Sequence, residues 1–225
     1  MKNIILQHFD GELGLLENLS IDNIKRYAQS VNADYKLLTG KVFREHLTSP
    51  CQKVHMISEE FDDYDNVLML DIDMFTPKNM VRDVFEVQGV GLHSDPVQVR
   101  LHQRLANSYP SIASLQSPYW GGAIYKMSRD LRVRLRAHLG GDESWMDNFN
   151  KRFEYEDEGI IHVLATKANI PPTNAYLDQK WCYCSYLPNP NTAGFIHIRN
   201  RVTPNGPHMP KLDVYYKLLA DGVFN

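Results

Sequence analysis

Several features that mark large classes of protein are missing from this sequence. No run of apolar residues approaches the length that crosses a membrane, and the amino-terminal segment has an apolar core too short for a signal peptide. The net charge of -3 and the isoelectric point near 6.3 argue against a general nucleic-acid binder, which would show clustered positive charge. There are three cysteines, and the C-x-C pair of Cys182 and Cys184 has no second pair or spaced histidines, so no zinc site is expected. These absences favour a cytoplasmic protein with reduced thiols.

The composition that is present is that of an ordinary globular protein. Its 225 residues are 43% hydrophobic and 23% charged, which is enough for a full core in one domain. We expect that domain to span residues 1–210. Residues 211–225 carry apolar side chains at helical spacing and are expected to form an amphipathic helix, which either docks on the domain or leads toward a further one.

A strand that ends in two aspartates is the most informative segment. Residues 67–70 are all apolar, and Asp71 and Asp73 follow them. Alternate residues of a strand face the same way, so the two carboxylates are expected to converge where the strand ends. Two hard oxygen donors suit Mn²⁺ or Mg²⁺. A D-x-D tripeptide alone is a weak signal, because acidic surface turns also supply it, but ligands of open α/β sheets collect at this end of such strands.

Strand and helix patterns alternate along the chain. Strands are expected at residues 2–9, 35–38, 66–70 and 87–92, and helices at 13–31, 50–61 and 80–85. The alternation predicts an α/β fold with a Rossmann-like, mostly parallel twisted sheet and helices on both faces. Residues 94–118 carry three prolines and few periodic apolar residues, so we expect a long loop or lid there.

Other segments allow two interpretations each. Lys53, in the first turn of an expected helix, either reaches a phosphate or is solvated. The glycines at 121 and 122 either let a ligand approach the backbone or form a bulge. The acidic residues at 154–158 either favour a helix dipole only or also do chemistry. His197 is either a core residue or a ligand, and the arginines at 132, 134 and 136 are expected on a solvated surface rather than in a nucleic-acid patch.

Four segments together resemble the metal-dependent, nucleotide-sugar glycosyltransferases of the GT-A fold, especially the retaining glycogenin-like and galactosyl- and xylosyltransferase-like groups. YDNVLMLDIDMFT (64–76) resembles their strand ending in D-x-D, and YWGGAIYKMS (119–128) resembles the small-residue segment beside the donor sugar. DEGIIHVLA (157–165) is similar to their D-Q-x helix start, and FIHIRNR (195–201) to the segment of their late metal-binding histidine. Order and spacing agree over nearly the whole chain. The similarity is greatest to amino-terminal domains of multi-domain chlorovirus glycosyltransferases that act on a capsid glycan.

The resemblance implies a role for each candidate residue. Asp71, Asp73 and His197 would hold Mn²⁺ or Mg²⁺, and Arg199 or Lys211 would contact the diphosphate. The nucleotide, with uracil as its base, would be bound by Gln7, His8, Phe9, Lys53 and Asp71. The sugar would be bordered by Trp120, Gly121 and Gly122. The catalytic residues would be Asp157 and Glu158. Two departures from the family pattern are visible. Glu158 stands where the family commonly has glutamine, and the lysine that follows the late histidine in the family has no clear match, which leaves Arg199, Arg201 or Lys211 for that role.

The implied activity is transfer of a hexose or deoxyhexose from a UDP-sugar to a glycan or glycoprotein acceptor, with retention, in the synthesis of a viral capsid glycan in the host cytoplasm. Nucleic acid and a membrane span are not expected as partners, whereas fusion to further domains is. One alternative is a nucleotidyltransferase or metal-dependent phosphohydrolase, although no glycine-rich phosphate loop follows the first strand. The other is a non-catalytic sugar-binding domain with a vestigial site.

Overall fold

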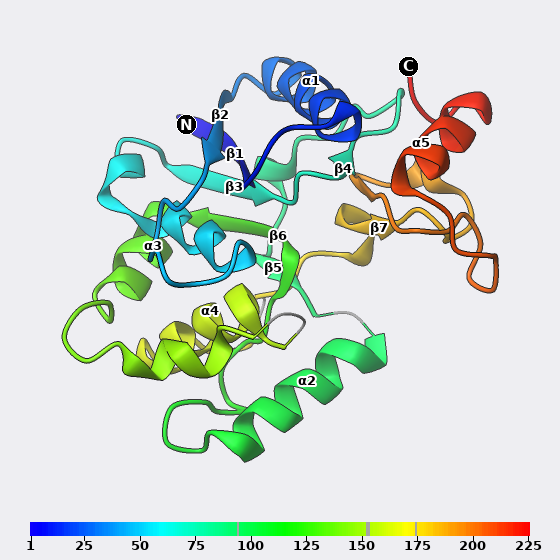
Figure 1. The fold of residues 1–225 in the computed structure, drawn as a ribbon. Coiled ribbons are helices and arrows are strands. Elements are labelled where there is room, and N and C mark those ends of the chain that lie inside the picture. Colours follow the sequence, from blue (N-terminus) through cyan, green and yellow to red (C-terminus); the bar gives the residue numbers. More distant parts are fainter. Residues whose placement is uncertain (94, 152–153, 174) are drawn as a thin grey trace.

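The protein is built on a five-stranded mixed sheet. The computed structural model describes residues 1–93, 95–151, 154–173 and 175–225 (Figure 1). The strands, in the spatial order β2-β1-β3-β6-β5, are β2 (Asp34–Thr39), β1 (Asn3–Phe9), β3 (Asn66–Leu70), β6 (Gly121–Ser128) and β5 (Gly91–Leu92). β1 pairs in parallel with β2 and β3, while β6 is antiparallel to both of its neighbours. Four strands therefore run in one direction, which confirms the predicted α/β fold with a mostly parallel sheet.

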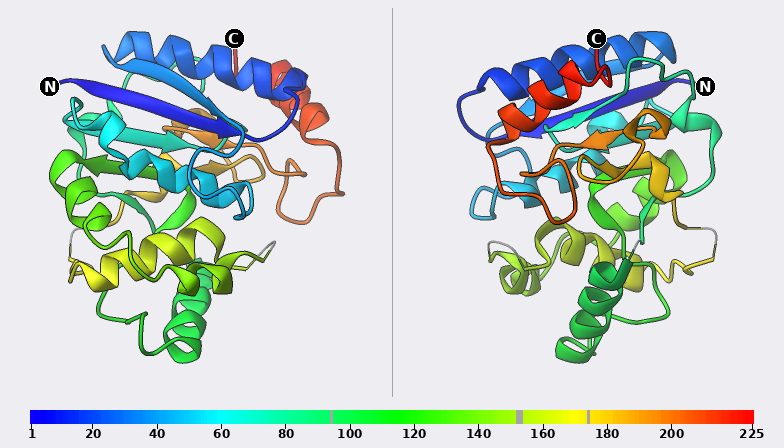
Figure 2. Two further views of the ribbon diagram at one scale, coloured as in Figure 1. Left: turned by 60° about the vertical axis from the view of Figure 1, so that its left-hand side comes forward. Right: turned by 90° about the vertical axis from the view of Figure 1, so that its right-hand side faces the viewer.

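Helices cover both faces of this sheet (Figure 2). Helix α1 (Leu15–Ser30) packs on one face, where Leu68 and Leu70 of β3 point. The opposite face, which receives Val67 and Met69, is covered by η1 (Pro50–Ile57), η2 (Glu59–Phe61), α3 (Arg129–Arg136), η4 (Ser144–Phe149) and α4 (Glu156–Lys167). Every side chain of the central strand from residue 67 to 70 is fully buried. The uninterrupted apolar run is explained by burial on both faces.

A small second sheet lies beyond the end of β3. It consists of β4 (Met74–Phe75), β8 (Ile196–His197) and β7 (Tyr183–Cys184), in the order β4-β8-β7. The short 3-10 helix η5 (Gln179–Trp181) precedes β7, and η6 (Pro190–Thr192) lies between β7 and β8. Helix α5 (Lys211–Ala220) follows and packs through Val214, Tyr215 and Leu218 against a cluster that includes Phe75 and Phe224. The carboxyl-terminal helix is thus docked beside the small sheet.

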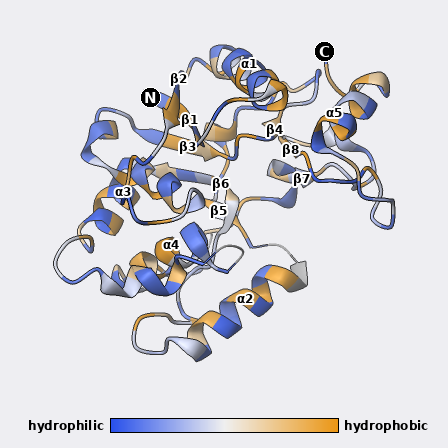
Figure 3. Cartoon of the chain, viewed as in Figure 1, coloured by the Kyte–Doolittle hydropathy of each residue, from blue (hydrophilic) through white to orange (hydrophobic). Residues whose placement is uncertain are grey.

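The segment from residue 95 to 108 is a helix and not the predicted loop. Helix α2 (Asp95–Ser108) extends from the body of the protein (Figure 1) and carries both hydrophobic and hydrophilic residues (Figure 3). Leu105 is fully buried, and Leu101, four residues earlier, packs against the same core. Two apolar residues one helical turn apart lie on the same face of the helix and pack it against the core. This pattern is too short to predict a helix in a segment that also carries prolines.

Two other expectations are only partly met. The expected helix at 80–85 is reduced to η3 (Val84–Glu86). The expected strand at 87–92 is shortened to β5, because Gly89, two residues before β5, has a left-handed backbone angle of φ 104°.

Arg132 was expected on a solvated surface, and this expectation is wrong because its side chain is fully buried. Its guanidinium donates hydrogen bonds to the carbonyls of Met127, Phe61 and Tyr64, which satisfies most of its donors inside the protein.

No helix within the described residues is long and apolar enough to cross a membrane. All three cysteines are free thiols. Burial raises the pKa of Cys51 to about 12 and raises that of Cys182 as well, so neither thiol is a ready nucleophile at neutral pH.

Candidate active site

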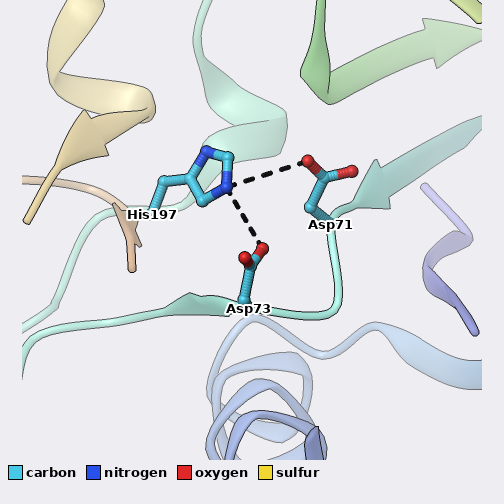
Figure 4. A group of neighbouring side chains, drawn as sticks. All are labelled: Asp71, Asp73 and His197. Carbon is cyan, nitrogen blue, oxygen red and sulfur yellow. Dashed lines mark ion pairs between the residues drawn. The ribbon is translucent and has the colours of Figure 1, made fainter. Parts of the chain in front are cut away.

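Two carboxylates and an imidazole converge at the carboxyl end of β3 (Figure 4). Nε2 of His197 lies 3.2 Å from Oδ1 of Asp73 and 3.9 Å from Oδ2 of Asp71. One ligand atom from each of the three residues lies within 4.8 Å of the other two. Asp73 and His197 are buried and Asp71 is half-buried, so the group opens toward solvent on the Asp71 side.

The backbone explains why these three residues meet. β3 ends at Leu70, the N–H of Asp71 still donates to the carbonyl of Ala123, and a turn closed from Met74 N to Asp71 O leads into β4. β8 then pairs antiparallel with β4, with His197 opposite Met74, and the N–H of Ile198 donates to the carbonyl of Asp73. The late histidine is therefore held beside the aspartates by the hydrogen bonds of the second sheet.

This donor set fits a divalent metal ion. Oxygen ligands with one imidazole suit Mn²⁺ or Mg²⁺, and ligand atoms held a few ångströms apart match the spacing around one ion. The second oxygen of each carboxylate is taken by a lysine: Oδ1 of Asp71 accepts from Lys53, and Oδ2 of Asp73 accepts from Lys211. The oxygens that remain are the ones that face His197.

Positive charge surrounds Asp73. Burial by itself would raise the pKa of the Asp73 carboxyl, but the charges and hydrogen bonds of His197 and then Lys211 outweigh it and hold that pKa well below its usual range. The guanidinium of Arg199, which is exposed, lies 3.5 Å from Nε2 of His197. Arg199 and Lys211 thus border the triad on the side of the second sheet, where a diphosphate would add negative charge.

Lys53 connects the aspartate triad to helix α4. Its buried ammonium lies 2.7 Å from Oδ1 of Asp71 and 3.0 Å from Oδ2 of Asp157, and it donates to the carbonyl of Gly122 at 2.6 Å. Burial alone would lower the pKa of this lysine, but the two carboxylates raise it strongly, so Lys53 stays charged. Of the two interpretations that the sequence left open for Lys53, the one that placed its side chain on a solvated face is wrong, because the side chain is buried.

The first turn of α4 places two further carboxylates beside the glycine pair. Oδ2 of Asp157 accepts from the hydroxyl of Tyr125 at 2.8 Å, whereas Glu158 accepts from Tyr119 at 2.6 Å and from the N–H of Gly122 at 2.7 Å. Burial, followed by the charge of Asp157, raises the pKa of Glu158 to about 7. The pKa of Asp157 is raised by burial too, against the opposing effect of Lys53. Burial therefore disfavours the charged form of both carboxyl groups, and the charge of Asp157 further disfavours ionisation of Glu158.

The fold matches that of solved glycosyltransferases. A glycosyltransferase involved in the glycosylation of the major capsid of PBCV-1 is 12% identical, with a TM-score of 0.57, over 98% of this chain and 100% of that one. The galactosyltransferase LgtC in complex with donor and acceptor sugar analogues is 10% identical, with a TM-score of 0.56, over 99% of this chain and 96% of that one. No family model and no curated protein matches the sequence. The chain has the GT-A fold. At these identities the likeness concerns the fold alone.

Within this GT-A fold the glycine pair permits close packing. A Cβ on Gly122 would lie 2.7 Å from Oδ2 of Asp157 and 3.2 Å from Cγ of Glu158, both of which are held by hydrogen bonds. At Gly121 the corresponding atom would lie 2.9 Å from the amide nitrogen of Gln98 on α2 and at an ordinary contact distance of 3.6 Å from the carbonyl oxygen of Leu92. Trp120 is fully buried and its indole N–H donates a hydrogen bond to the carbonyl of Ala175, so its side chain packs inside the protein next to the glycine pair.

The first-strand residues occupy different depths in the GT-A fold. Gln7 is fully buried, donates to Ser20 and to the carbonyl of Asp71, and accepts from Tyr35. His8 is bonded to the carbonyl of Gly40, and burial lowers its pKa, while Phe9 is half-buried at the strand end. Phe9 and His8 are thus nearer the surface than Gln7. The buried Gln7 side chain instead holds the main chain of Asp71 through its hydrogen bond to the Asp71 carbonyl.

Sequence reasoning missed two residues of this candidate site. Tyr119 and Tyr125 each give a hydroxyl hydrogen bond to one of the paired carboxylates. Both stand in the aromatic segment around the glycine pair, but their spacing of six residues has no meaning until α4 is placed beside β6. The contacts between α4 and β6 supply that placement.

Proposed function

We propose that this protein is a metal-dependent glycosyltransferase that moves a hexose or deoxyhexose from a UDP-sugar to a glycan acceptor. The observation that carries the proposal is the convergence of Asp71, Asp73 and His197 at the end of β3, next to the carboxylates that start α4. The GT-A fold agrees with it. A nucleotide-sugar needs both halves of such a site, one for its diphosphate and one for its sugar.

The triad would hold Mn²⁺ or Mg²⁺. When bound, the ion supplies a Lewis acid that neutralises charge developing on a leaving diphosphate. Lys211 and Arg199 add positive charge on the same side and would contact the diphosphate oxygens. Gln7, His8 and Phe9 would set the uracil side of the nucleotide pocket, with Lys53 and Asp71 completing it.

The sugar would lie against Gly121 and Gly122, in front of the start of α4. Asp157 and Glu158 would hold its hydroxyls and stabilise the positive charge that develops at the anomeric carbon. Tyr119, Tyr125 and Lys53 keep both carboxylates in place through the hydrogen bonds described above. Transfer with retention is part of the proposal, and it rests on the resemblance of the four segments to retaining groups.

The biological setting that we propose is glycan synthesis on a viral capsid protein, in the host cytoplasm, by a chain joined to further domains. The structural neighbour described as acting in the glycosylation of the major capsid of PBCV-1 supports this setting. The resemblance of the sequence as a whole to amino-terminal domains of chlorovirus glycosyltransferases also supports it.

The decisive experiment is a donor screen. The protein is incubated with Mn²⁺ and a panel of UDP- and GDP-sugars, and in parallel with nucleoside triphosphates, and released nucleotide is measured. We expect release from at least one UDP-sugar, its loss with EDTA, and its loss in Asp73→Ala. Asp63→Ala, which removes an exposed carboxylate, is the matched control and should behave as the wild type. Nucleotide-sugar binding without turnover would favour the sugar-binding alternative, and release from nucleoside triphosphates instead would favour a phosphohydrolase or nucleotidyltransferase.

A further inference from the structure

A polar network lies in the otherwise apolar layer between the large sheet and helix α1. It is formed by Gln7 of β1, Ser20 of α1 and Tyr35 of β2, and the first two side chains are fully buried. Ser20 stands on the buried stripe of α1, between Leu16 and Ile24. An apolar side chain at either buried position would need no hydrogen bonds, so packing alone does not explain these polar groups.

Both polar atoms of the Gln7 amide are used inside the protein. Nε2 donates to Oγ of Ser20 at 3.0 Å and to the carbonyl of Asp71 at 3.1 Å, while Oε1 accepts from the hydroxyl of Tyr35 at 2.9 Å. These partners fix the orientation of the amide. Because neither amide hydrogen remains for a nucleotide base, Gln7 serves the proposed nucleotide pocket through Asp71.

Ser20 extends the network to the other end of the turn that carries the aspartates. Its hydroxyl donates to the carbonyl of Met74 at 2.7 Å. Met74 also closes the turn, because its N–H donates to the carbonyl of Asp71 at 3.2 Å. The carbonyls at both ends of the turn are therefore held by two buried side chains, Gln7 and Ser20, which are hydrogen-bonded to each other.

The position of this turn decides where the three candidate metal ligands lie. Asp71 and Asp73 are part of the turn itself. His197 is paired with Met74 across β4 and β8, and the N–H of Ile198 donates to the carbonyl of Asp73 at 3.0 Å. Release of the turn from the network would thus move the carboxylates and the imidazole relative to one another.

We infer that Gln7 and Ser20 are positioning residues, which hold the turn of residues 71–74 in the conformation that binds the metal ion. They act through the main chain of Asp71 and Met74. A buried network with every member satisfied makes a segment rigid, and replacing residues that support metal ligands typically costs roughly 10–100-fold in metal affinity. The metal part of the inference rests on the proposed function, whereas the hold on the turn does not.

The test combines Mn²⁺ binding with hydrogen exchange of single amides, in the full chain without nucleotide. Gln7→Met and Ser20→Ala remove the network, and each should weaken Mn²⁺ binding by about tenfold in a calorimetric titration. Each should also speed exchange of the Met74 N–H, followed by NMR, more than that of amides in α3. Tyr35→Phe removes only the outermost hydrogen bond, so it keeps the inference testable if Gln7→Met does not fold, and it should shift both readouts in the same direction by less.

Tyr27→Phe is the matched control on the same helix. The Tyr27 hydroxyl donates to the carbonyl of Arg82 and accepts from the N–H of Val84, and neither bond involves the turn. Its removal should lower the urea midpoint, as Ser20→Ala does, but leave Mn²⁺ affinity and Met74 exchange as in the wild type.

Equal effects in the Tyr27 variant would overturn the inference, as would unchanged Mn²⁺ affinity or unchanged Met74 exchange in the Gln7 and Ser20 variants. A wild type that binds no Mn²⁺ would contradict the proposed metal-dependent function, and Met74 exchange would then decide by itself whether the network holds the turn. Mn²⁺ binding without nucleotide release from any sugar donor would count against the proposed function and leave the inference to the same two measurements.

Discussion

Lys53 and Asp71 form a 2.7 Å ion pair inside the protein, and the same ammonium lies 3.0 Å from Asp157 at the start of α4. One lysine therefore joins a carboxylate of the Asp71–Asp73–His197 group to a carboxylate at the start of α4. The two halves of the proposed site are held in fixed relation by a residue of η1, and the first prediction concerns the loss of this link.

Replacing Lys53 by methionine should lower the free energy of unfolding by about 3–5 kcal/mol, because two buried carboxylates lose their shared counter-charge. Urea denaturation measures the effect. Lys36→Met is the matched control: Lys36 pairs with Glu60 on the surface, its side chain is 47% exposed, and its removal should change stability by only about 0–1 kcal/mol. Adding Asp157→Asn to Lys53→Met should recover part of the loss. Equal effects of the two lysine changes would contradict a structural role for the buried pair.

His197→Ala should weaken Mn²⁺ binding by at least about tenfold, since it removes one of three ligand groups, and changes at supporting residues alone reach that size. Calorimetric titration of the metal-free protein with Mn²⁺ gives the affinity directly and requires no substrate. His208→Ala, at an exposed histidine of the same region, should titrate as the wild type. If the His197 variant also titrates normally, His197 has a packing role only.

Gly122→Ala should reduce turnover strongly while Gly121→Ala reduces it little. The added methyl group at 122 meets Asp157 and Glu158, which are fixed by Lys53, Tyr125 and Tyr119. At 121 its close contact is with the far end of the longer Gln98 side chain. The comparison is made as kcat/KM for the donor, with circular dichroism as the check on folding. Similar losses in both variants would mean that the carboxylates do not depend on the small residue at 122.

The raised pKa of Glu158 makes stability depend on pH. Between its ordinary value of 4.5 and its folded value of about 7, the folded protein binds more protons at this group than the unfolded chain does. Stability should therefore fall as pH rises through this window and level off above it, by an amount on the order of 3 kcal/mol, since one pKa unit corresponds to about 1.4 kcal/mol.

Glu158→Gln should remove that dependence. The amide can keep the hydrogen bonds to Gly122 and Tyr119 but has no proton to lose, so the variant should gain on the wild type as pH rises from 4.5 to 7. Urea midpoints measured across this range test the expectation. Parallel curves for the two proteins would show that Glu158 does not titrate in the window.

Much of the fold and the position of the two aspartates could be predicted from the amino-acid pattern. The apolar run at 67–70 indicated a strand buried on both faces, and the alternation of strands and helices indicated the sheet. The D-x-D spacing correctly indicated that the carboxylates of Asp71 and Asp73 converge beyond the strand, but a turn from Asp71 to Met74 brings them together and not the alternation of a strand. The helix at 95–108 escaped notice because two buried leucines carry its pattern.

The sequence by itself thus determined which segments are buried and where a pair of carboxylates stands. Only the tertiary structure decided which distant residues join them. His197 reaches Asp73 because β8 pairs with β4, and Lys53 reaches Asp71 and Asp157 because η1 packs between β3 and α4. A lysine in a first helical turn and a histidine between apolar residues look alike in sequence whether they are solvated, buried or functional. Their partners lie far away along the chain, and packing brings them within hydrogen-bond distance.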